Sequence, residues 1–203
     1  MIHVLRFSSS EYEWDQVPPA REAWTKQIKG IPLQLGDIPL EPQLAGPFKM
    51  PDVGKPSEAF FFASDRGRAG LEELAPGCFA FFPVSLQAPE SMQLEKRYWF
   101  VEVTARAQSI DWDRSETKKL AFPAPDGRAI RVLARGGVFG KCAKFKAVTP
   151  DTPPLWREAD LDLSDLKYSL SKLEILMRDE FWEALNTKFP RQLTARKITE
   201  RDD

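Results

Sequence analysis

Residues 59–86 read AFFFASDRGRAGLEELAPGCFAFFPVSL, and this stretch decides the fold class. The apolar run 59–63 is typical of a buried strand, and Ser64 or Asp65 can cap the helix that follows. A Pro-Gly pair then ends the helix, and the apolar residues 79–86 are typical of another strand. The stretch therefore predicts a strand, a helix and a strand in succession.

Residues 174–198 have the same order of features: an apolar run, a helical segment that starts at an aspartate, a proline stop and a second apolar run. An alignment without a gap matches three pairs of positions: Asp65 with Asp179, Leu71 with Leu185, and Pro76 with Pro190. A repeat this short also arises by chance, because strand-helix-strand is a common unit. We nevertheless expect two similar units.

Most of the remaining segments predict strands. Further strands are expected at 2–7, 98–107, 129–133 and 142–148, the last two joined by a glycine-rich turn at 136–140. A helix is expected at 20–29, and the prolines of 41–56 predict a long loop. The sequence thus predicts an α+β fold, with a mainly antiparallel mixed sheet and about three helices.

Composition places the chain among globular proteins. It has 203 residues, 42% of them hydrophobic and 29% charged, which argues against disorder and coiled coils. No apolar run approaches the roughly 18 residues that cross a bilayer, and residues 1–10 lack the features of a secretory signal. We expect a cytoplasmic protein without membrane contact. Residues 1–58 are interpreted as a strand, a helix and a Pro-rich loop packed on a main domain at 59–203.

The reactive residues do not assemble a familiar catalytic set. His3 is the only histidine, and Cys78 and Cys142 form no CxxC pair, so we expect buried free thiols, no metal and no enzyme. The glycine-rich turn lacks the spacing of a phosphate-binding loop, and no cofactor is expected. Asp111 and Asp113 could form an acid-base pair, but carboxylates here are more typical of turn caps.

Charge is unevenly distributed, although the net charge is −1. Residues 114–146 contain nine Lys or Arg and two acids, a local balance of +7. Four acids without a compensating base follow: Glu158, Asp160, Asp162 and Asp165. Such patches can bind a partner of opposite charge, although solvated surfaces are the simpler interpretation.

Three parts of the chain resemble a known family. They are the serine-capped helix and Pro-Val strand at 63–84, the segments YWFVEV at 98–103 and IDWDRS at 110–115, and LWR at 155–157 with LMRDEFWEAL at 176–185. Arg178 departs from the pattern, because it stands where a serine cap is expected. Together these segments resemble the bacterial immunity proteins of polymorphic toxin systems, a family formerly catalogued as a domain of unknown function. The resemblance implies a protein without catalytic activity that binds and neutralises a cognate toxin encoded nearby. It transfers no site residues.

These observations lead to one functional prediction and two alternatives. The prediction is an immunity protein that presents the four acids to a basic toxin cleft, and presents basic residues to an acidic one. The basic residues are Arg131, Arg135, Lys141 and Lys144. The alternatives are an adaptor or chaperone for a secreted effector and, with less support, a nucleic-acid-binding module that uses 114–146. Neither the toxin nor the oligomeric state follows from the sequence.

Overall fold

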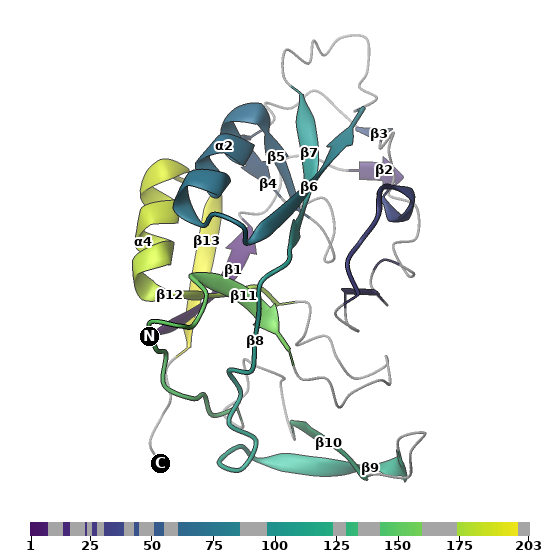
Figure 1. The fold of residues 1–203 in the computed structure, drawn as a ribbon, viewed down its shortest axis with the longest axis vertical. Helices are drawn as coiled ribbons and strands as arrows, with labels where there is room; N and C mark the ends of the chain where they lie inside the picture. The colour runs from purple at the N-terminus through teal and green to yellow at the C-terminus, as the bar shows by residue number, and fades with distance from the viewer. Residues whose placement is uncertain are drawn as a thin grey trace.

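The strands form two main sheets, shown with the helices in the computed structural model of Figure 1. The structure describes residues 1–7, 14–16, 23, 26–27, 31–38, 43–44, 51–54, 61–85, 97–123, 129–133, 143–159 and 174–198. The four-stranded sheet has the order β4 (Val53–Gly54), β5 (Phe61–Ser64), β7 (Tyr98–Val103), β6 (Phe79–Val84). The five-stranded sheet has the order β13 (Leu193–Ile198), β1 (Ile2–Phe7), β12 (Leu176–Arg178), β11 (Leu155–Glu158), β8 (Arg106–Ala107).

The other elements whose bounds are described are two small sheets and three helical segments. The small sheets pair β2 (Trp14–Gln16) with β3 (Gln43–Leu44) and β9 (Thr117–Pro123) with β10 (Ala129–Leu133). The helical segments are α2 (Asp65–Leu74), α4 (Asp179–Lys188) and the 3-10 turn η1 (Leu35–Asp37). Residues 23, 26 and 27 are also helical, within the helix predicted at 20–29, whose other residues lie outside the described ranges. The predicted α+β class is confirmed.

Helix α2 begins and ends where the sequence predicts. The Ser64 hydroxyl caps it by accepting a hydrogen bond from the Gly67 amide at 3.1 Å, and the same hydroxyl donates to Asp52 at 2.7 Å. After the last turn, Gly77 adopts a positive φ of 75°, a conformation that glycine reaches without steric cost. The chain then turns directly into β6.

Helix α4 begins at Asp179 although its capping position holds Arg178, whose side chain makes no capping bond. Asp179 and Glu180 lie in the first turn, where carboxylates interact favourably with the positive end of the helix dipole. Beyond the helix, Arg191 has a φ of 64° at the position equivalent to Gly77. The start predicted at Asp179 is therefore correct despite the missing serine.

The two units share one topology, which confirms the predicted repeat. In the first, β5 and β6 flank β7, which is antiparallel to both; in the second, β12 and β13 flank β1 in the same way. The register also matches, since Trp99 pairs with Ala63 and Pro83 while His3 pairs with residues 177 and 197. Trp99 donates to the first aspartate of α2, and His3 lies 2.5 Å from the equivalent aspartate of α4. The central strand of the second unit thus comes from the other end of the chain.

The main core joins the two units. Helices α2 and α4 lie side by side, and the buried Leu71 of α2 belongs to one apolar cluster with Phe181 and Leu185 of α4. The same cluster takes in side chains from both sheets, among them Val101 and Met177. Burial of this shared surface holds the units against each other.

Two local predictions are wrong. The segment 41–56 is not only a loop, because it contributes β3 and β4. Of the segment 142–148, predicted as a strand beside β10, the described residues make only an isolated bridge between Phe145 and Ile110. Strand β10 pairs instead with β9, its near neighbour in the chain, while residues 144 and 146 bond to the backbone at 111 and 109. The division of the chain at residue 58 remains a proposal.

Candidate functional site

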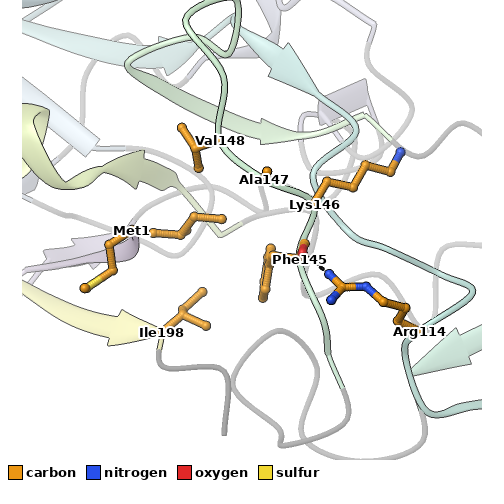
Figure 2. A pocket seen from close by; sticks show the side chains of 8 residues that line it. Met1, Arg114, Phe145, Lys146, Ala147, Val148 and Ile198 are labelled. Atoms are coloured by element: carbon orange, nitrogen blue, oxygen red, sulfur yellow. Dashed lines mark hydrogen bonds between the residues drawn. The ribbon is translucent and has the colours of Figure 1, made fainter. Parts of the chain in front are cut away.

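A pocket of 590 Å³ opens at one end of the five-stranded sheet (Figure 2). The start of β1, the end of β13 and residues 145–148 come together there. Its apolar wall is formed by Met1, Ile2, Phe145, Ala147, Val148 and Ile198. The two charged lining residues, Arg114 and Lys146, are both basic. The pocket thus combines an apolar surface with positive charge.

Two of the apolar lining residues, Ile2 and Phe145, belong to the protein core and are called here the floor of the pocket. Ile2 and Phe145 are 6% and 4% exposed, and both pack in a cluster with Ile110, Trp156 and Leu176. Phe145 is also fixed through its backbone by the bridge to Ile110. A floor held in this way is preformed, so a ligand does not need to order it.

A turn positions Arg114 at the pocket wall. Asp111 accepts hydrogen bonds from the Arg114 amide at 3.2 Å and from its Nε at 2.7 Å. The Arg114 guanidinium also donates from Nη2 to the carbonyl of Phe145. These bonds with Arg114 hold the pKa of Asp111 below its ordinary value. The turn interpretation of Asp111 is confirmed.

Glu158, predicted as part of an exposed acidic patch, faces the interior. It is 5% exposed and accepts hydrogen bonds from the Ser109 amide at 2.9 Å and hydroxyl at 2.5 Å. The same hydroxyl accepts a bond from the Trp156 indole at 3.1 Å. All four residues of β11 are buried, so its acid must be satisfied internally. The expectation of surface exposure for Glu158 is therefore wrong.

The other predicted contact residues are placed only in part. Lys144 is half-buried, and its backbone is bonded to the turn at 111–115. The backbone of Arg131 lies in β10, opposite Lys119, and its side chain is not among those described. Five predicted contacts lie outside the described residues: Arg135, Lys141, Asp160, Asp162 and Asp165. Cys142 lies outside them as well, while Cys78 is a buried free thiol as predicted.

Sequence reasoning missed a buried ionic group between the sheets. Glu102 and Arg157 are 2% and 1% exposed, and Arg106 lies 3.9 Å from the Glu102 carboxylate. Glu102 also accepts a hydrogen bond from the Leu33 amide at 3.2 Å, which fastens residues 31–38 to β7. Burial raises the pKa of Glu102 and lowers that of Arg157. The sequence signal that could have revealed this buried ionic group was Glu102, the single acid in the apolar strand YWFVEV.

His3 takes part in a similar internal contact. It is buried in β1, bonded to Asp179 and stacked on Trp182 with ring centroids 6.3 Å apart. The hydrogen bond to His3 lowers the pKa of Asp179. Within the described ranges, no group of three His, Cys, Asp or Glu is placed to hold a metal. No helix among the described elements is long and apolar enough to span a bilayer.

The model of an immunity protein family, Imm11, matches residues 9–123, which is more than half of the chain. The chain belongs to the Imm11 family. The match spans the complete four-stranded sheet, helix α2 and the Asp111 turn, and it confirms the resemblance noted in the sequence. No curated protein matches the chain. In an Imm11 protein, the pocket and the charged surface residues are of interest as places where another protein could bind.

Proposed function

We propose that this protein is an immunity protein without catalytic activity, which binds a cognate bacterial toxin domain and neutralises it. The observation that carries the proposal is the family match over residues 9–123. The bound immunity protein neutralises the toxin by covering the toxin's active site or blocking access to it. The proposed site of action is the bacterial cytoplasm, where a toxin of a polymorphic system would otherwise act.

The physical character of the chain supports this role. An inhibitor must present a fixed surface, and the shared core of α2, α4 and both sheets gives a rigid support for one. The histidine, the buried thiol and the buried ions that the structure describes are engaged in internal contacts or packing. A pocket whose floor belongs to the core is suited to an anchoring side chain of a partner.

Charge supports a selective complex. The basic residues Arg131, Arg135, Lys141 and Lys144 are proposed to meet an acidic region of the toxin. Asp160, Asp162 and Asp165 are proposed to meet a basic one, without the inward-facing Glu158. Opposite charges on two surfaces accelerate association and penalise partners with the wrong charge pattern.

A rescue assay tests the proposal. The toxin domain encoded beside this gene is expressed alone from an inducible promoter, with or without the full-length protein, and growth is recorded. We expect growth to be restored, and we expect the purified protein to abolish the toxin's activity at a ratio of about one to one. An adaptor or chaperone would change secretion without rescuing these cells. Failure to rescue at equal expression, together with uninhibited toxin activity, would refute the proposal.

A further inference from the structure

We propose that the 590 Å³ pocket is the anchor site for the toxin, and that it takes a large apolar side chain lying next to a carboxylate on the toxin surface. This inference rests on the proposed function and names the partner chemistry of one site. Nothing in the family match assigns a role to the pocket, since Phe145, Val148 and Ile198 lie outside the matched residues.

The apolar half of the inference follows from the pocket wall. Met1 and Ile198 lie on one side of the opening and Phe145 lies opposite them, while Val148 lies on a further side (Figure 2). The volume lies in the range of pockets that bury most of a small ligand, and it exceeds the space that one side chain needs. A projecting segment of a protein, with an aromatic or large aliphatic residue at its tip, fits such a volume. Buried anchors of this kind dominate the binding energy of protein interfaces.

The acidic half follows from the charged residues. Both charged side chains that line the pocket are cations, and Arg114 is held in place by Asp111 and by the carbonyl of Phe145. A fixed guanidinium loses little conformational entropy when a carboxylate approaches, whereas a freely moving one would lose more. An apolar side chain flanked by Asp or Glu therefore matches the pocket better than an uncharged or basic segment.

The position of the pocket in the chain strengthens the charge argument. Arg114 and Lys146 are the first and last residues of the basic segment 114–146, which carries nine basic and two acidic residues. The two ends of this segment therefore both lie at the pocket. The field of the basic segment attracts an acidic surface over about 10 Å at 0.1 M salt, and the pocket then receives its apolar anchor.

Two substitutions test the inference, each with a matched control. Ala147 is an exposed lining residue, so Ala147→Trp fills the opening without disturbing the core, and Ala69→Trp places the same side chain on an exposed position of α2. Lys146→Glu reverses a charge of the pocket, and Arg97→Glu makes the same change at an exposed site outside the pocket lining. Thermal unfolding verifies that all four variants remain folded.

Binding is measured by calorimetry with an inactivated form of the toxin domain encoded beside this gene. We expect Ala147→Trp and Lys146→Glu to weaken the affinity at least 10-fold while both controls stay within about 2-fold, and we expect the Lys146→Glu effect to shrink as salt is raised from 50 to 500 mM. If the wild-type protein binds and rescues cells but Ala147→Trp binds equally well, the pocket inference is wrong and the immunity function stands. If the wild-type protein neither binds nor rescues, both are refuted.

Discussion

Of Gly36, Gly67, Gly70 and Gly77, Gly67 is the one where an added methyl group would lie closest to a neighbouring atom. A Cβ atom built there would lie 2.0 Å from the carbonyl oxygen of Asp52 and 3.0 Å from its carbonyl carbon. Both atoms belong to the backbone, so the contact cannot be relieved by rotation of a side chain. Gly67→Ala must therefore displace either the start of α2 or the residues that lead into β4.

The magnitude follows from the bonds that converge on Asp52. Its carbonyl accepts the Ser64 amide at 2.9 Å, and its carboxylate accepts the Ser64 hydroxyl at 2.7 Å. Overpacking costs about 1–3 kcal/mol, each weakened bond adds up to about 1 kcal/mol, and alanine returns about 1 kcal/mol of helix propensity. The net expectation for Gly67→Ala is a loss of about 2–3 kcal/mol in the free energy of unfolding.

Equilibrium unfolding in urea at 25 °C measures this loss. The control is Gly36→Ala, because a Cβ atom at Gly36 meets nothing within 4 Å, and its unfolding free energy should stay within about 0.5 kcal/mol of wild type. The slope of free energy against urea should be unchanged in both variants. A Gly67→Ala protein as stable as the Gly36→Ala protein would refute the reasoning.

Three further predictions concern buried or bonded carboxyl groups, and urea unfolding measures each. Glu158→Ala leaves the amide and hydroxyl of Ser109 without their buried acceptor, and it should lower the unfolding free energy by about 2–3 kcal/mol. The raised pKa of Glu102 means that the native state holds the proton of this carboxyl more tightly than the unfolded state, so stability falls as pH rises from the ordinary to the raised pKa. Glu102→Gln should remove this fall, and a variant with the pH slope of wild type would contradict the prediction. The lowered pKa of Asp179, caused by its bond to His3, gives stability that is present above the ordinary pKa and lost as pH falls through the lowered one. Asp179→Asn should therefore flatten the acid limb of the stability curve, and a limb as steep as that of wild type would count against the contact.

Local features of the fold could be predicted because short-range physics determines them. The caps and stops around α2 and α4 act within a few residues, and the aligned aspartates are the first residues of both helices. The position of β1 between β12 and β13 could not be predicted in this way. It depends on pairing between residues that are more than 170 positions apart, and no local signal specifies such a partner.

The site was harder to predict than the fold. From the sequence, Glu158 resembles the start of a solvated acidic run, because no residue near it in the chain indicates that it will accept hydrogen bonds from the distant Ser109. The alternation that favoured a strand at 142–148 reflects a real inward position of Phe145, but the segment bonds to the turn at 111–115. The pocket also escaped prediction, because its wall brings together residues from both ends of the chain and the middle.

The insertion of β1 into the second unit also affects how the protein forms on the ribosome. The first unit is continuous between Val53 and Val103, so all four of its strands are available once that stretch has emerged. The second unit cannot form at that point, because β1 remains without its partner β13 until nearly the whole chain has been synthesised. Closing a contact over that separation is slow, and an open strand is exposed to wrong pairing in the meantime. Assembly should therefore proceed in two stages: the strands of the first unit pair early, and the second unit and the shared core form only when the two ends of the chain meet.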